Sequence, residues 1–253
     1  MSDRNHIIFT LISFSAIVIG LILANKLITK KENKKLLLKI SALLTVIIHF
    51  SSLYTEYFSG LEPDLEDSMI LPLYPCNLAM WTLLVLAFMK NTESKVFKFL
   101  CVFTFYLGIF GGILGIVINE IYINNPDLTD WGVLKGLLSH TTMLYGCVYI
   151  VVGGFLKPRV SNMFFVFLGL LSLFEYGVLM IFIHYVFGLD IPNVMYILEK
   201  PFEALRWLNV GTIGVGALLI IFIGLAVYEW IALKKEDRWY TKLKAYIETK
   251  RAK

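Results

Sequence analysis

The chain of 253 residues is much more apolar than a soluble protein. Apolar side chains make up 58% of it before its 18 glycines are counted, whereas about 45–50% is usual for a soluble domain with glycine included. Charged residues reach only 17%, against roughly 25% in soluble domains. A soluble globule, a disordered chain and a disulfide scaffold are therefore excluded. The composition predicts a protein that crosses a membrane several times.

Seven apolar segments are long enough to cross a bilayer. A hydrocarbon core about 30 Å thick requires roughly 20 helical residues, and a helix satisfies its own backbone groups in lipid. We therefore expect an all-α fold, a polytopic bundle of seven transmembrane helices that forms a single integral membrane domain over residues 1–253. The expected helices cover residues 7–25, 36–58, 70–89, 96–118, 133–154, 163–187 and 209–233.

Most of the 23 lysines and arginines lie in alternate connections between these segments. Positively charged connections stay in the cytoplasm, so we expect the N-terminus outside the cell, the C-terminus inside, and residues 234–253 as a basic cytoplasmic tail. The net charge of +4 then reflects contact with anionic lipid and gives no indication of nucleic-acid binding. The expected location is the cell membrane, and the expected partners are membrane lipids, as substrate or as surroundings.

Reactive and ionisable side chains within the membrane are the candidate functional groups, because a bilayer disfavours them unless they are paired or line a wet cavity. With a rise of about 1.5 Å per residue, Cys76 and His140 both lie roughly 10 Å below the outer surface, on different helices. His49 and Glu56 are seven residues apart on one face of the second helix, and Glu175 is near the middle of the sixth. We expect one cavity that opens outward.

A cysteine and a histidine at equal depth indicate a nucleophile and its base, since the thiolate attacks and an imidazole can take the thiol proton. Packing is the alternative for a buried cysteine, and it is our interpretation of Cys101 and Cys147. Glu175 either orients His140 in a Cys-His-Glu arrangement or joins two helices as a hydrogen-bonded acid. Asn77 is either an oxyanion donor or a cap at the start of its helix.

Other site chemistries have weaker support in the sequence. His49, His140 and His184 lie on three different expected helices, so no HxxxH or HxxxE pair is present, and we expect no metal and no other cofactor. Ser139 precedes His140, but no GxSxG segment indicates a serine nucleophile.

Glycine and proline interruptions do not repeat along the chain. A transporter with broken helices would show them in two related halves, whereas Pro72 and Pro75 have no counterpart in a second half. Small residues four apart allow two helices to approach closely. We therefore expect a close helix–helix contact along the fourth helix, at Gly108, Gly111, Gly112 and Gly115.

Four segments between residues 70 and 201 resemble the YwaF-like integral membrane family, in order along the chain. Leu71-Pro72-Leu73-Tyr74-Pro75-Cys76-Asn77-Leu78 is similar to the family's Leu-Pro-Leu-His-x-Cys. The others are Tyr106-Leu107-Gly108-x-x-Gly111-Gly112, Ser139-His140-x-x-x-Leu144-x-Gly146, and Pro192-Asn193-Val194-Met195-Tyr196-Ile197 followed by Lys200-Pro201. The chain departs from the family at Tyr74, where histidine is common, and at Val194, where tyrosine is usual. The first departure removes a possible second base beside Cys76.

The eukaryotic relatives of this family resemble acyltransferases that move a fatty acyl group between phospholipids, with the acyl chain carried on the equivalent cysteine. The resemblance implies that Cys76 is the nucleophile and His140 its base. The predicted function is a membrane-embedded lipid acyltransferase or acyl hydrolase. The residues expected to bind the substrate or its oxyanion are Asn77, His49, Glu56 and Asn193. The alternative is a non-enzymatic small-solute transporter or ligand-binding sensor, in which the histidines and carboxylates matter more than the cysteine.

Overall fold

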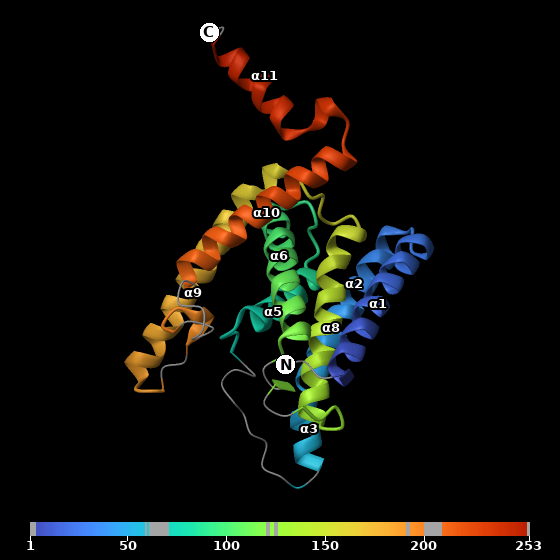
Figure 1. The fold of residues 1–253 in the computed structure, drawn as a ribbon, viewed down its shortest axis with the longest axis vertical. Helices are drawn as coiled ribbons and strands as arrows, with labels where there is room; N and C mark the ends of the chain where they lie inside the picture. The colour runs from blue at the N-terminus through green and yellow to red at the C-terminus, as the bar shows by residue number, and fades with distance from the viewer. Residues whose placement is uncertain are drawn as a thin grey trace. The chain divides into compact units, whose positions relative to one another are not determined.

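The computed structural model is built from helices and their connections (Figure 1). It describes residues 4–58, 60, 71–119, 122–123, 126–190, 193–199 and 209–251, and it contains no strand in these ranges. The chain divides into two compact units, Met1–Leu156 and Lys157–Lys253. The expectation of one integral membrane domain stays a prediction.

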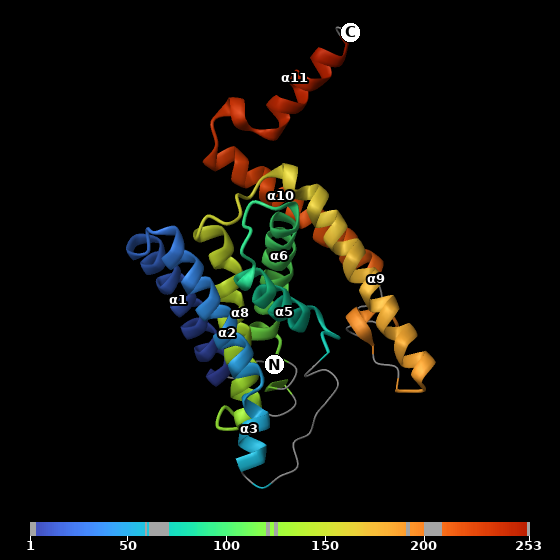
Figure 2. The same cartoon turned by 180° about the vertical axis from the view of Figure 1, so that it is seen from behind.

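The first unit is a bundle in which α8 lies at the centre. Helix α8 packs against α6, α2, α1 and α5, and α5 also packs against α2 and α6; Figure 2 shows these helices from behind. Contacts between α6 and α8 run in reverse order along the two helices, so the helices are antiparallel. The helices of this unit are α1 (Arg4–Leu27), α2 (Lys31–His49), α3 (Ser51–Phe58), α5 (Pro75–Phe88), α6 (Lys95–Val117) and α8 (Trp131–Val152).

The glycines of α6 allow this close approach, as the sequence predicts. A Cβ atom added at Gly112 would lie 2.8 Å from the Cβ of Leu144 on α8, and one at Gly108 would overlap Cys147. Cys147 is fully buried in this contact. The predicted close helix–helix contact is confirmed, and α6 and α8 form its two sides.

Capping hydrogen bonds or a proline set where three of these helices begin. Asp130 accepts a hydrogen bond from the backbone N–H of Val133 and caps α8, and Ser94 caps α6 in the same way. Helix α5 instead begins with Pro75, which has no N–H to leave unpaired, and Tyr74 before it makes no side-chain cap. Cys76 therefore lies in the first turn of a helix that lacks a side-chain cap.

The second unit consists mainly of α9 (Met163–Phe187) and α10 (Val210–Ala232), which pack against each other. Helix α9 ends at Gly188, whose φ of 65° is left-handed and suits glycine. Asn209 caps α10 by accepting from the N–H of Thr212. The remaining elements are the 3₁₀ helices η1 (Val160–Asn162), η2 (Val194–Tyr196) and η3 (Lys235–Asp237), and the C-terminal α11 (Trp239–Arg251).

Four helical segments among the described residues are long and apolar enough to cross a membrane: α1, α6, residues 160–187 and α10. Helix α5 is apolar but has only 14 residues. Helices α2 and α8 are less apolar, since α2 begins with several lysines and α8 carries Lys135 and the polar residues of the site. An all-helical fold with several candidate spans is thus confirmed, while seven spans and the orientation of the termini stay predictions.

Two expected helices have different boundaries in the structure. The helix expected over 36–58 is interrupted at Phe50, between α2 and α3. The hydroxyl of Ser51 donates to the carbonyl of Ile48 at 2.6 Å, and such side-chain bonds compete with the helical ladder. The helix expected from residue 70 begins only at Pro75, because a proline fits the first helical position and disfavours helical backbone before it.

Candidate functional site

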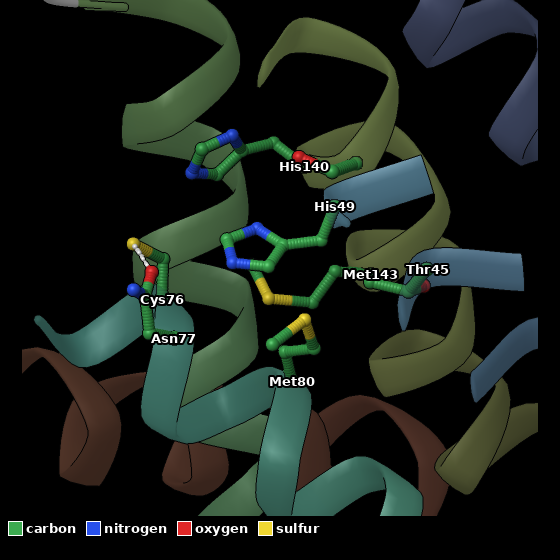
Figure 3. A pocket seen from close by; sticks show the side chains of 8 residues that line it. Thr45, His49, Cys76, Asn77, Met80, His140 and Met143 are labelled. Carbon is green, nitrogen blue, oxygen red and sulfur yellow. Dashed lines mark hydrogen bonds between the residues drawn. The ribbon is translucent and has the colours of Figure 1, made fainter. Parts of the chain in front are cut away.

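A small pocket lies among α2, α5 and α8 in the first unit (Figure 3). Its empty volume is about 220 Å³. The imidazoles of His49 and His140 both project toward the side of the pocket where Cys76 and Asn77 lie. The lining residues are Thr45 and His49 from α2, Cys76, Asn77 and Met80 from α5, and Ser139, His140 and Met143 from α8.

The start of α5 positions the Cys76 sulfur. The backbone N–H groups of Cys76 and Asn77 interact with this sulfur, and the first amides of a helix have no partner within the helix. The thiol also donates to Oδ1 of Asn77, with a sulfur–oxygen distance of 3.3 Å. A helix N-terminus favours negative charge, so this surrounding suits a cysteine that reacts as a thiolate.

His140 is held by its own helix in an orientation suited to a base. Its Nδ1 lies 2.7 Å from the carbonyl oxygen of Gly136. A carbonyl only accepts hydrogen bonds, so Nδ1 carries the hydrogen and Nε2 keeps the lone pair. The same imidazole interacts directly with the Cys76 thiol. The structure therefore brings the predicted nucleophile and the predicted base together, with Nε2 left to receive the proton.

Helix α6 lies directly behind both reactive side chains, because two of its residues lack a side chain. A Cβ atom at Gly115 would overlap the ring of His140, and one at Gly111 would lie 3.2 Å from the Cα of Cys76. The two glycines are four residues apart and so share one face of α6. Sequence reasoning predicted a helix contact here and missed that the contact supports the site.

The hydroxyl and thioether residues of the pocket were also missed. Thr45 Oγ1 lies 2.9 Å from the carbonyl of Ser41 and 3.1 Å from Oγ1 of Thr142, so it helps to join α2 to α8. His49 lies one turn further along α2. Met80 and Met143 are mostly buried and carry no pattern that separates them from ordinary core residues. Only Ser139 had a signal, since it precedes His140.

A lysine lies one turn from the pocket on α8. Lys135 Nζ donates to the hydroxyl of Ser52 at 3.0 Å, and Trp131 Nε1 donates to Ser51 at 3.0 Å. Trp131, Lys135 and Ser139 recur at four-residue intervals and therefore share a face of α8, with about 6 Å of axial rise between Lys135 and Ser139. The signal that could have found Lys135 is its charge, which stands alone in an otherwise uncharged helix.

The remaining predicted site residues are Glu56, Glu175 and Asn193. Glu56 belongs to α3, but its side chain is outside the described part of the structure. Glu175 is exposed on α9, and Asn193 organises its own loop, accepting from the N–H groups of Leu198 and Glu199 and donating to the Glu199 carbonyl. Both belong to the second unit, so their predicted roles at Cys76 and His140 stay predictions.

Metal ligation has no support in the residues that the structure describes. Among them, no group of three or more histidines, cysteines, aspartates and glutamates could hold a metal ion. In the first unit, Nε2 of His6 lies 2.7 Å from the carbonyl oxygen of Ile116, near the end of α6. In the second unit, His184 is buried, and its Nδ1 lies 2.8 Å from the carbonyl oxygen of Met180. These two histidines have structural contacts within their own units.

Comparison with known proteins identifies one family. The model of the TMEM164 family matches residues 1–227 of the chain, a range that includes every residue of the pocket. No curated protein and no solved structure matches the chain.

Proposed function

The chain belongs to the TMEM164 family, and we propose that it is a membrane-embedded lipid acyltransferase in which Cys76 carries the acyl group. One observation carries the proposal: the Cys76 thiol, in the first turn of α5, interacts with an imidazole whose other nitrogen is bonded to the Gly136 carbonyl. Such a pair is what nucleophilic catalysis by cysteine requires. The resemblance to the YwaF-like family supplies the choice of a phospholipid ester as substrate.

In the first step, the S–H bond turns from Oδ1 of Asn77 to Nε2 of His140, and this nitrogen takes the thiol proton while the sulfur attacks the ester carbonyl. The carbonyl oxygen becomes an oxyanion, and its proposed donors are the backbone N–H groups of Cys76 and Asn77, which lie beside the sulfur, together with the Asn77 side-chain amide. The carbon–oxygen ester bond then breaks. The departing lysophospholipid oxygen takes the proton from His140, and a thioester remains on Cys76.

In the second step, a hydroxyl group of an acceptor lipid attacks the thioester. His140 removes the hydroxyl proton and returns it to the sulfur as the carbon–sulfur bond breaks, so the thiol and the neutral imidazole are regenerated. With water as acceptor, the same sequence hydrolyses the acyl group. The acceptor that enters the pocket therefore decides between transfer and hydrolysis.

The lining of the pocket suits the ester group of a lipid. The empty volume of about 220 Å³ includes space that is open to the surroundings, so the proposal places only the ester group at the pocket and leaves the long acyl chains outside it. Met80 and Met143 line the pocket, and their flexible side chains suit a partly apolar guest.

The proposal is tested by trapping the thioester. The purified chain is placed in nanodiscs that contain a phospholipid with an alkyne-bearing acyl chain. The labelled residue is assigned by mass spectrometry, and loss of the label on treatment with hydroxylamine identifies a thioester. We expect label on Cys76 in the wild type and none in Cys76→Ala. His140→Asn should slow labelling by on the order of 10²-fold or more, because it removes the general base.

Cys101→Ala is the matched control, since Cys101 is a fully buried cysteine of α6 outside the pocket. In Cys101→Ala, Cys76 should be labelled at the wild-type rate. Equal label in the wild type and in Cys76→Ala would overturn the proposal. If Cys76→Ser fully retained transport or binding of a small solute, a transporter or sensor would be favoured instead.

A further inference from the structure

The C-terminal helix α11 is attached to the end of α10 by a buried carboxylate. Glu229 is only 2% exposed. One of its oxygens accepts the backbone N–H of Trp239, the first residue of α11, and the other accepts the N–H of Val160, each at 2.7 Å. Since the N-terminal amides of a helix lack partners within it, Glu229 acts as the cap of α11 from a neighbouring helix.

Further contacts fix the turn between the two helices. Arg238 donates through Nε to the carbonyl of Leu233 at 3.0 Å, and its guanidinium lies 5.2 Å from the ring centroid of Trp230. The ring of Trp239 packs edge-on against Phe222, with centroids 5.6 Å apart. Helix α10 is long and apolar enough to cross a membrane. The start of α11 is therefore held at one end of a candidate membrane span.

One side of α11 carries an apolar stripe. At about 100° per residue, its five large apolar residues fall within an arc of roughly 120° around the helix. Leu243, Tyr246 and Ile247 are 47%, 60% and 41% exposed. The stripe begins beside α10 and continues along the rest of the helix. Its members are Trp239, Tyr240, Leu243, Tyr246 and Ile247.

Basic residues border this stripe on both sides. By the same helical geometry, Lys242 lies along one edge, and Lys244 and Arg251 lie along the other. Lys250 falls within the stripe, with its ammonium 5.9 Å from the ring centroid of Tyr246. Long basic side chains can bury their carbon stems in an apolar surface and extend their charges to the headgroups. An apolar arc between two basic borders is the pattern of a helix that lies in a membrane interface.

We propose that α11 binds anionic lipid headgroups at the surface of the bilayer that α10 crosses. The apolar stripe enters the boundary between headgroups and acyl chains, and the flanking charges contact the phosphates. Charge complementarity favours an anionic lipid surface, and so does the attachment of α11 to the end of a candidate span. Tryptophan and tyrosine at the start of the helix fit the same level of the membrane. The inference is independent of the chemistry at Cys76.

Hydrogen–deuterium exchange of the full chain in nanodiscs tests this. We compare the amides of residues 239–251 in phosphatidylcholine discs with discs that also contain phosphatidylserine. Phosphatidylserine should slow their exchange, and high salt should remove the difference, because it screens the charges. Each basic residue is expected to contribute about fivefold to the binding. The triple variant Lys242→Gln, Lys244→Gln and Arg251→Gln should thus lose on the order of 100-fold of the lipid-dependent protection.

The matched control removes the same charge elsewhere. The control is the triple variant Lys90→Gln, Lys95→Gln and Lys98→Gln, whose positions are between α5 and α6 or at the start of α6. It should leave the protection of α11 unchanged. Glutamine keeps a helix propensity close to that of lysine and arginine, so the α11 variant retains its helix. Equal exchange in the two kinds of disc, or protection that appears only when an acidic soluble protein is added, would overturn the proposal.

Discussion

Replacing Gly115 by alanine should disable the pocket while leaving the chain folded. A Cβ atom at this position would overlap Cδ2, Nε2 and Cγ of the His140 ring. The ring and α6 cannot both keep their places. Because Nδ1 of His140 is bonded to the Gly136 carbonyl of its own helix, the ring must give up that bond, or its contact with Cys76, in order to make room.

The two expected effects differ in size. Overpacking a well-packed site destabilises a protein by about 1–3 kcal/mol, and alanine in place of glycine within a helix returns about 1 kcal/mol. The net loss of about 0–2 kcal/mol should lower the unfolding midpoint by no more than about 8 °C. Displacement of a general base instead reduces a rate by roughly 10²–10⁴-fold.

The measurement is the initial rate of thioester formation on Cys76, together with the thermal unfolding midpoint of the same preparation. Two other glycines give a graded series. Gly224 on α10 has nothing within 4 Å of an added Cβ, so Gly224→Ala should change neither quantity. At Gly111 the added Cβ would meet the Cα of Cys76 at 3.2 Å, so Gly111→Ala should have an intermediate effect. Wild-type labelling by Gly115→Ala would refute our reasoning about His140.

Two further predictions concern buried or membrane-level carboxylates. Glu175→Gln should keep the rate of acyl transfer within about an order of magnitude of the wild type, since the Gly136 carbonyl already fixes the His140 tautomer. A loss of roughly 100-fold or more in the folded variant would support a Cys-His-Glu arrangement. Glu229→Gln keeps one acceptor oxygen and turns an NH₂ group toward a backbone N–H. Its expected cost is about 1–3 kcal/mol, measured as faster hydrogen exchange at residues 160–162 and 239–251, with labelling of Cys76 unchanged; unaltered exchange would contradict the capping role.

The sequence predicted the partners of the pocket better than the boundaries of the helices. Equal depth on two helices was enough to pair Cys76 with His140, because helical rise converts residue number into depth. Apolar length alone could not show the interruption at Phe50, which depends on a local bond from the Ser51 hydroxyl. Composition suggested seven spans, and the structure supports four candidates among its described residues.

The residues that orient the site were harder to predict. The group that fixes the His140 tautomer is a backbone carbonyl at Gly136, and carbonyls carry no sequence signal, since every residue has one. A carboxylate is the partner that a sequence can name, so Glu175 was weighed in that role, with a hydrogen-bonded acid between two helices as the alternative. The twofold role of Glu229 was missed for a similar reason, because both of its partners are backbone N–H groups.

The shortness of α5 has a consequence for the lipids around the pocket. With 14 residues, the helix is about 21 Å long, roughly 9 Å less than a typical hydrocarbon core. A helix of this length that started at one boundary of the core would end inside it, and mismatch of this kind is relieved by local thinning of the bilayer. Under the proposed function, thinning would bring the ester plane of a leaflet closer to the Cys76 sulfur, so bilayer thickness would become a variable in how readily a lipid ester meets the thiol.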